Sequence, residues 1–345
     1  MQTYRLALIG FGNVGQGFAQ ILRDFGAHYE QQFGARFLIT AISDLQKGCL
    51  YDPDGLDPAA LLAAVNASGS LGSVSAPHKG WDALKTITES NADVVAELSF
   101  TDLKTGEPAI SHLKAAIQSG KHVITTNKGP VALAFRELKT LADEHGVIIG
   151  VEGAVMSGTP SLRLGMDLLS AAEVTCIQGI INGTTNYILS QMDAGAAYAD
   201  ALAEAQAKGY AEADPTGDVE GFDAAGKVVI LANLLMGADI RMADVDRIGI
   251  TRLTVDDIKV ARANGERWKL IGKVEKTVDC VKASVKPQCL PETHPLAQVG
   301  GATNAITFTT KLLGDVTLIG PGAGRLETGY ALVGDLLALH RSKTI

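Results

Sequence analysis

A glycine-rich turn close to the start of the chain constrains the fold more than any other feature. It lies between an apolar strand-like run, Tyr4–Ile9, and a helix-like run, Gln16–Phe25, and it consists of Gly10, Phe11, Gly12, Asn13, Val14 and Gly15. This pattern is G-x-G-x-x-G, in which the first glycine permits a tight turn, the second lets a pyrophosphate approach, and the third lets helix and strand pack closely. The helix N-terminus adds free N–H groups and partial positive charge. We therefore predict a Rossmann-type fold that binds NAD or NADP.

Strands and helices alternate after this turn. The predicted strands are Phe37–Ile42, Val94–Leu98, His122–Thr125 and Val147–Val151. Helices are expected at Pro108–Ser119 and Leu133–His145, and such alternation implies right-handed crossovers and a doubly wound, mostly parallel α/β sheet. We assign residues 1–152 to this dinucleotide-binding domain, together with 321–345, because the helical tail Thr328–His340 can return to cover it.

The regular alternation of strands and helices ends after residue 152, and we predict an α+β substrate and dimerisation domain over residues 153–320. Its expected elements are strands at 174–182, 278–285 and 305–310 and helices at 198–208 and 224–236. The Asp-, Ala-, Gly- and Ser-rich segment 52–74 is interpreted as a helical insertion with flexible flanks. The insertion contains no motif that indicates a catalytic or binding function.

Charge and composition exclude several functions. The net charge of −8 argues against nucleic acid, whose binding depends on clustered Lys and Arg. No segment reaches the run of about 18 apolar residues that a membrane span needs. The first strand begins at Tyr4, which leaves no room for a signal peptide, and the four cysteines form no metal or disulfide pattern. We expect a cytoplasmic protein without nucleic-acid or membrane partners.

Asp44 ends the second predicted strand, where a carboxylate can accept hydrogen bonds from the adenosine ribose. This position favours NAD, because a 2′-phosphate would be repelled. Lys47 could offset that repulsion and admit NADP. Alternatively, Asp44 simply caps a turn, so the cofactor preference stays open.

Two polar residues follow neighbouring strands of the sheet. Lys128 comes after His122–Thr125, in a segment interpreted as a loop ended by Gly129 and Pro130, and Ser99 comes after Val94–Leu98. Ligands bind outside the carboxyl ends of parallel strands, so both residues are candidates to contact the cofactor. The alternative for Lys128 is a solvated surface lysine.

The densest polar group lies at residues 209–218 and continues to Asp223 and Lys227. Asp223 and Lys227 are four residues apart and share one face if they are helical. Four carboxylates facing one lysine can bind an ammonium group while the lysine serves as an acid. Alternatively, the segment is a solvated, acidic helix N-terminus. A Ca²⁺ loop fits poorly, because the D-x-D-x-D-G spacing is missing.

At this point the residues resemble a known family, the homoserine dehydrogenases, in their short form without an appended regulatory domain. The resemblance covers nearly the whole chain. It rests on the glycine turn and on Thr126-Asn127-Lys128, Glu152 to Val155 and Pro160, Asn182 to Asn186, Gly209-Tyr210-x-Glu212 to Lys227, His294 to Ala297, and Gly320 to Gly324. The family interconverts L-homoserine and L-aspartate 4-semialdehyde with NAD(H) or NADP(H), and the products feed threonine and methionine biosynthesis.

The resemblance implies a role for each matching residue. Lys227 is the acid that protonates the carbonyl oxygen, and Lys128 is a second lysine near cofactor and substrate. The substrate-binding residues are Glu212, Asp218, Asp223, Gly183, Thr184 and Tyr210. Gly209 approaches the cofactor, as does Gly322 or Gly324.

The resemblance also implies a structural monovalent cation, such as sodium, and a homodimer. The cation ligands would be Glu152, Val155, Ser157 and Thr159, although a turn carboxylate without a metal is the open alternative. Residues around 293–320 would help to form the dimer contact.

Two rival functions remain. A semialdehyde dehydrogenase with a cysteine nucleophile has a similar two-domain plan, but Cys176 lies in an apolar run and is expected to pack rather than react. A non-catalytic dinucleotide sensor has the same fold. Such a sensor needs no proton donor, so the presence of Lys128 and Lys227 argues against it.

Overall fold

The structure, a computed structural model, describes residues 1–342 and divides into two compact units. The first unit contains Met1–Gly158 and the chain from Gly324 onward, and the second contains Thr159–Ala323. We had expected the divisions next to residues 152 and 321. The segment that follows residue 152 packs with the first unit, where Ser157 Oγ lies 2.9 Å from Thr328 Oγ1 of the C-terminal helix.

The first unit is built on a seven-stranded sheet. Its strands, in chain order, are β1 (Gln2–Ile9), β2 (Ala35–Asp44), β3 (Gly48–Tyr51), β4 (His78–Lys79), β5 (Val94–Glu97), β6 (His122–Thr125) and β7 (Ile149–Gly150). The spatial order is β4-β3-β2-β1-β5-β6-β7, in which β2, β1, β5, β6 and β7 are parallel and β3 and β4 form an antiparallel edge. The order reverses at β1, and a crevice at such a reversal is where doubly wound sheets bind ligands. The predicted α/β fold is confirmed.

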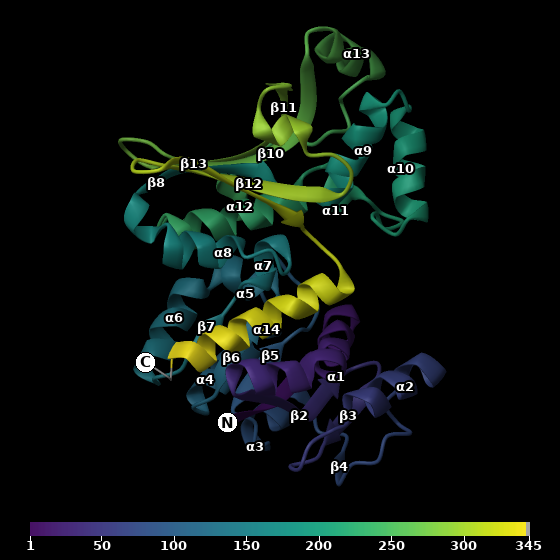
Figure 1. The fold of residues 1–345 in the computed structure, drawn as a ribbon, viewed down its shortest axis with the longest axis vertical. Helices are drawn as coiled ribbons and strands as arrows, with labels where there is room; N and C mark the ends of the chain where they lie inside the picture. The colour runs from purple at the N-terminus through teal and green to yellow at the C-terminus, as the bar shows by residue number, and fades with distance from the viewer. Residues whose placement is uncertain (343–345) are drawn as a thin grey trace. The chain divides into compact units, whose positions relative to one another are not determined.

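Helices cover both faces of this sheet. They are α1 (Asn13–Phe33), α2 (Pro58–Ser68), α3 (Ala83–Glu89), α4 (Ala109–Gln118), α5 (Lys128–Leu133), α6 (Phe135–Glu144), α7 (Gly153–Met156) and α14 (Arg325–Ser342). Figure 1 shows α14, at the yellow end of the chain, beside α1, at the purple end. A Cβ at Gly17 of α1 would overlap the carbonyl oxygen of Arg325, and one at Gly329 would lie 2.6 Å from Phe18 N. Two glycines therefore permit the close crossing of α1 and α14.

The segment 52–74 contains the predicted helix. In α2, the Asp57 carboxylate accepts the backbone N–H of Ala59, and Pro58 occupies the first turn, where its missing N–H costs nothing. Leu61 and Leu62 are buried, and α2 packs on α1. The insertion thus extends the hydrophobic core of the first unit.

The second unit has a six-stranded sheet with the order β13-β12-β8-β10-β11-β9. Its strands are β8 (Val174–Ile180), β9 (Asp246–Arg247), β10 (Glu266–Lys276), β11 (Val281–Pro291), β12 (Thr303–Thr310) and β13 (Gly314–Pro321). All pairs are antiparallel except β9 with β11. Its helices are α8 (Ser161–Arg163), α9 (Gly183–Asp193), α10 (Tyr198–Ala207), α11 (Thr216–Val219), α12 (Phe222–Leu235) and α13 (Val255–Ala263), with short helical turns η1 (Leu164–Leu168), η2 (Ser170–Ala172), η3 (Met242–Asp244) and η4 (Pro295–Gln298). The predicted α+β character is confirmed.

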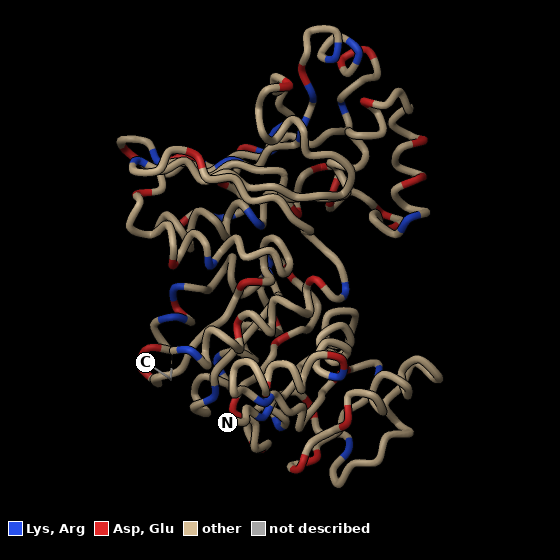
Figure 2. Tube along the Cα trace, in the orientation of Figure 1, with Lys and Arg blue, Asp and Glu red and all other residues tan. Residues whose placement is uncertain are grey.

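Charged residues of both signs are interspersed along the backbone of each unit (Figure 2). Such mixing differs from the clustered Lys and Arg of a nucleic-acid surface. Within residues 1–342, none of the helices is long and apolar enough to cross a membrane.

Candidate active site

The glycine turn connects β1 to α1 in the first unit. Gly10 has φ +107°, and a Cβ there would lie 2.5 Å from Leu98 O, so only glycine fits. A Cβ at Gly15 would lie 2.8 Å from Gly10 O, whereas one at Gly12 would meet nothing within 4 Å and would project into open space. The first turn of α1, which includes Asn13 and Val14, carries no acidic side chain and Gly12 supplies no side-chain cap. Free N–H groups and an open backbone fit a pyrophosphate.

Phe11 contributes differently from the glycines. Its side chain is completely buried, and its backbone N–H donates to Asp44 Oδ2 at 2.6 Å. It therefore anchors the turn to the end of β2, and its ring is not available to stack on a ligand.

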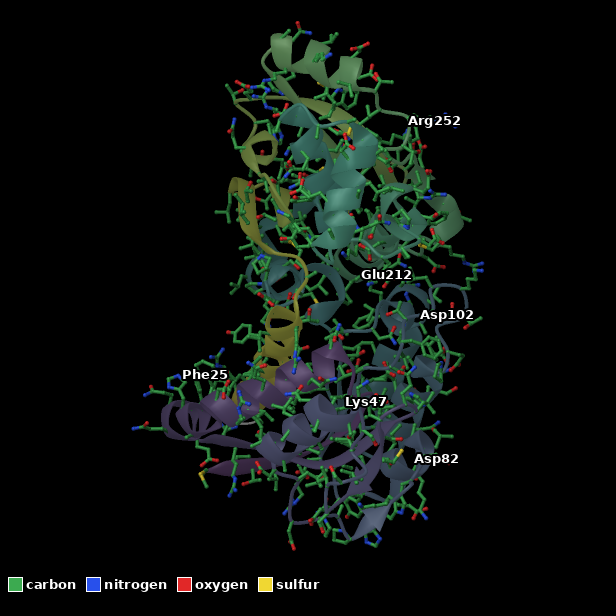
Figure 3. The ribbon with its side chains drawn as sticks, turned by 90° about the vertical axis from the view of Figure 1, so that its right-hand side faces the viewer. Phe25, Lys47, Asp82, Asp102, Glu212 and Arg252 are labelled. Atoms are coloured by element: carbon green, nitrogen blue, oxygen red, sulfur yellow. The ribbon has the colours of Figure 1, made fainter. Side chains whose placement is uncertain are left out.

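Asp44 closes the β2 end of the crevice. Its other carboxylate oxygen accepts the N–H groups of Gln46 (2.9 Å) and Lys47 (2.8 Å). Burial by itself would raise the pKa of Asp44, but the N–H groups of Phe11, Lys47 and Gln46 outweigh it and hold the pKa below its usual value. The carboxylate is thus ionised beside the glycine turn and also caps a turn. Lys47 follows it in the β2–β3 turn (Figure 3).

Ser99 lies on the loop that follows β5, and Lys128 comes shortly after the neighbouring parallel strand β6. Ser99 donates its backbone N–H to Glu97 Oε1 at 3.2 Å. Lys128 is not in a loop, as we had expected, but is the first residue of α5, whose N-cap is Asn127. Pro130 is compatible with this helix because it falls in the first turn, where its N–H is not needed.

Lys227 is the centre of a polar cluster in the second unit. Its Nζ lies 2.7 Å from Asp223 Oδ2, one turn earlier on α12, and donates to Ile181 O at 2.8 Å. The lysine side chain is 9% exposed. Burial of the long lysine side chain holds its ammonium group in one place. The contact with Asp223 is the one that the four-residue spacing predicted.

Asn182 links the carboxylates of this cluster. Its Nδ2 donates to Asp218 Oδ1 at 2.7 Å and to Asp223 Oδ2 at 3.0 Å. Burial raises the pKa of Asp218, and the nearby charge of Asp223 acts in the same direction, whereas Asn182 opposes them. Because its side chain also caps α9 by accepting Thr185 N–H, Asn182 fixes the cluster to the end of β8.

The remaining predicted substrate residues lie at the start of α9 and on the loop after α10. Thr184 Oγ1 donates to Tyr210 O at 2.6 Å, and Gly183 begins α9. Gly209 has φ +73° with open space where a side chain would be. Glu212, labelled in Figure 3, is exposed on the loop between α10 and α11. The structure thus brings Asp218, Asp223 and Lys227 together and leaves Glu212 outside this buried group.

Gly322 follows β13 in the second unit. A Cβ at this position would overlap the side chain of Asn304, which is fully buried in β12. The glycine is therefore required by packing against Asn304.

The predicted cation ligands lie in one short segment that includes α7. Glu152 is 4% exposed and donates its N–H to Asp335 Oδ2 at 3.2 Å, and Val155 is buried in α7. Ser157 has φ +55°, which is unusual for a residue with a side chain, and Thr159 Oγ1 donates to Pro321 O at 2.9 Å. In residues 1–342, no group of three or more His, Cys, Asp or Glu gathers as a metal site. Backbone carbonyls would have to supply most ligands.

Cys176 does not have the properties of a nucleophile. It lies in β8, and burial raises the pKa of its thiol above the ordinary value. A raised pKa reduces the thiolate fraction, and the thiolate is the reactive form.

The comparisons with known proteins agree with this chemistry. The sequence model of the family described as homoserine dehydrogenase matches residues 160–337. The chain is 45% identical to the NAD(+)-dependent homoserine dehydrogenase of Pseudomonas canavaninivorans, over 100% of this chain and 98% of that protein. A putative homoserine dehydrogenase from Archaeoglobus fulgidus has a TM-score of 0.88 at 35% identity, over 98% of this chain and 99% of that one. A hyperthermophilic archaeal homoserine dehydrogenase in complex with NADPH has a TM-score of 0.83 at 27% identity, covering 99% and 98%.

A glycine turn that fits a pyrophosphate and a buried ammonium group beside carboxylates define a nicotinamide-dependent oxidoreductase. The full-length similarity then specifies its kind. The chain belongs to the homoserine dehydrogenase family and is an NAD(P)-dependent enzyme of amino-acid biosynthesis that interconverts L-homoserine and its aldehyde. These findings decide against both the cysteine-dependent dehydrogenase and the non-catalytic sensor.

Proposed function

We propose that Lys227 is the general acid that protonates the carbonyl oxygen of L-aspartate 4-semialdehyde as this is reduced to L-homoserine. The observation that carries the proposal is the position of its buried Nζ between Asp223 Oδ2 and Ile181 O. An ammonium group has three N–H donors, and within the described chain two are directed at these oxygens. The third is suited to a substrate oxygen.

A nicotinamide cofactor, when bound at the glycine turn, would supply the hydride for the carbonyl carbon. Negative charge then develops on the oxygen, where the Lys227 ammonium group stabilises it and transfers a proton. In the oxidation direction, neutral Lys227 accepts the proton of the homoserine hydroxyl. Asp223 keeps the Lys227 side chain oriented both in reduction of the aldehyde and in oxidation of the alcohol.

Substrate recognition in the proposal depends on opposite charges. Glu212, Asp218 and Asp223 attract the α-ammonium group of the substrate, and Asp218 is joined to Asp223 through Asn182. The free N–H groups at the start of α9, next to Gly183 and Thr184, suit its carboxylate. On the loop after α10, Tyr210 would contact the substrate and Gly209 would approach the cofactor.

For the cofactor, we propose contacts with the glycine turn, Asp44, Ser99, Lys128 and the loop of Gly322. Asp44 would accept hydrogen bonds from the adenosine ribose, and its ionised carboxylate disfavours a 2′-phosphate. We therefore propose a preference for NAD over NADP. The relative from Pseudomonas canavaninivorans, which is named NAD(+)-dependent, supports this preference.

We make three further proposals, which concern a bound cation, the oligomeric state and the location in the cell. A sodium ion bound by Glu152 and the carbonyls of Val155, Ser157 and Thr159 would stabilise the turn, and the buried carboxylate fits a cation. The second unit would form a homodimer through residues around 293–320. A cytoplasmic location is supported by the four cysteines, all of which are free thiols.

Replacement of Lys227 tests the proposal. Lys227→Ala should lower kcat by about 100-fold or more while the Kd of NADH stays unchanged, because general acid catalysis contributes about 10²–10⁴. Glu212→Ala should chiefly raise KM for the aldehyde. Oxidation of NADH by aspartate 4-semialdehyde, followed by absorbance, gives kcat and KM, and quenching of protein fluorescence gives Kd.

Lys259→Ala is the matched control, because the Lys259 side chain is 72% exposed on α13 and pairs with Asp256. It should match the unsubstituted enzyme in each measurement. Near-normal kcat in Lys227→Ala would refute the assignment of the acid.

A further inference from the structure

Glu97 is a completely buried carboxylate at the carboxyl end of β5. Burial of a carboxylate is costly unless hydrogen bonds replace its hydration. Within residues 1–342, its partners are the backbone N–H (3.2 Å) and hydroxyl of Ser99, His112 Nδ1 (3.3 Å) and Asn127 Nδ2 (3.2 Å). No step of the mechanism above uses this residue.

The hydrogen-bond partners of Glu97 suit a carboxylate that carries a negative charge. Oε1 accepts the backbone N–H of Ser99, and Oε2 accepts the side-chain amide of Asn127, and both of these groups can only donate. His112, itself buried on α4, has its Nδ1 3.3 Å from Glu97 Oε1 and can donate to it when Nδ1 carries the proton. Each oxygen is thus matched to donors, as the ionised form requires.

The same network fixes two loops. Asn127 Nδ2 also donates to the carbonyls of Ser99 (3.3 Å) and Phe100 (3.1 Å), and its Oδ1 accepts the N–H of Gly129 at the start of α5. The loop after β5 is thereby joined to the loop after β6. Lys128 directly follows Asn127, so the backbone position of this lysine depends on the bonds of Glu97.

Both loops lie at the carboxyl ends of neighbouring parallel strands, the edge of the sheet at which this fold binds its ligands, and the proposed contacts of Ser99 and Lys128 are with the cofactor. The nicotinamide ring is cationic in NAD⁺ and neutral in NADH. A fixed negative charge close to the ring attracts the cationic oxidised form and not the neutral reduced form. The attraction is stronger than it would be in water, because the protein interior screens charges less.

We propose that Glu97 is a positioning residue with a second, electrostatic effect: it holds Ser99 and Lys128 in place for the cofactor and biases the site toward the oxidised nicotinamide. The inference deepens the proposed function, because it depends on nicotinamide binding at these two loops. It does not depend on Lys227 or on the substrate.

The test compares Glu97→Gln, which removes the charge, with Glu97→Asp, which keeps the charge on a shorter side chain. Thr125→Val is the matched control for geometry. Thr125 Oγ1 joins the same two loops, by donating to Glu97 O at 2.8 Å and accepting Asn127 N–H at 2.9 Å, but it carries no charge. The Kd values of NAD⁺ and NADH are measured by calorimetry without substrate, and thermal unfolding shows that each variant is folded.

Glu97→Gln should weaken NAD⁺ by about three- to tenfold more than NADH, because only the oxidised ring carries a charge for Glu97 to attract. Glu97→Asp should change the Kd ratio little but lower kcat, because it displaces the loops. Thr125→Val should weaken both forms by the same factor. Ser99→Ala removes one partner of Glu97 but no charge, and it should lower kcat with an unchanged Kd ratio.

An unchanged Kd ratio in folded Glu97→Gln would overturn the electrostatic effect. A shift of the ratio in Thr125→Val as large as in Glu97→Gln would also overturn it, because loop geometry alone would then be the cause. Normal kcat in Glu97→Asp or Ser99→Ala would overturn the positioning role. Because the Kd measurements need no aldehyde, they separate a failure of this inference from a failure of Lys227 as the acid.

Discussion

The Asp44 carboxylate accepts three backbone N–H groups and so connects the glycine turn to the β2–β3 turn. Asp44→Ala should reduce the free energy of unfolding by about 1 kcal/mol at neutral pH, a value discounted for partial exposure to solvent. Its pKa is lowered in the folded state, so the stabilisation is present above the unfolded pKa of about 3.9 and is lost as pH falls through the folded pKa. The difference between variant and parent should therefore shrink below about pH 4.

Urea unfolding of both proteins at a series of pH values measures this difference. Asp54→Ala, which removes an exposed carboxylate of the same unit, is the control and should show no such trend. A difference that is equally large at the lowest and at neutral pH would contradict the account of Asp44.

Sequence and structure agree best for residues whose interactions are local. The spacing of Asp223 and Lys227 predicted their contact, and the glycine pattern predicted the turn at Gly10. Asn182 was missed as a site residue, although an Asn between a strand and Gly-Thr-Thr is a typical N-cap that could have been noticed. Glu97 was interpreted as part of an apolar strand, because its partners are distant in the sequence and leave no local pattern.

The packing of α1 against α14 depends on glycine at the scale of whole helices. Gly17→Ala should destabilise the protein by about 1–3 kcal/mol, because the new methyl group would overlap the Arg325 carbonyl and force the helices apart. Gly26→Ala, on the same helix with nothing within 4 Å of the added carbon, should instead stabilise by about 0.5–1 kcal/mol.

Chemical denaturation of the two alanine variants distinguishes these effects. Opposite signs are expected, since both variants gain the same helix propensity and only Gly17 meets an obstacle. Equal stabilisation of both variants would show that the helices do not cross as closely as the structure indicates.

Elements with a strong periodic or apolar signal were predicted, and short or mixed ones were not. The apolar helix α12 and the Ala-rich helix α10 lie within two residues of their expected bounds. The long strand β10 was missed, because its charged residues, Lys269 and Lys273 among them, hide the alternation of a strand. The predicted strand at 278–285 in fact begins at Val281, and the fully exposed Val278 lies in the preceding turn.

At the scale of the whole molecule, each unit contains one part of the proposed site. The glycine turn, Asp44 and the loops after β5 and β6 belong to the first unit, and the Lys227 cluster belongs to the second. The sequence predicted this division of roles, since each motif is contiguous. The first unit extends beyond residue 152 because Ser157 bonds to Thr328 of α14, which is far away in the chain.

The central claim is that this chain transfers a hydride directly from nicotinamide to the carbonyl carbon of aspartate 4-semialdehyde, while Lys227 delivers the proton. Reaction with NADH that is dideuterated at the reactive ring carbon, followed by mass spectrometry and NMR of the product, tests it most directly. The account predicts homoserine with deuterium on the carbon that was the aldehyde, and slower formation of the same labelled product by Lys227→Ala. Product without deuterium, or with label derived from solvent on that carbon, would contradict it.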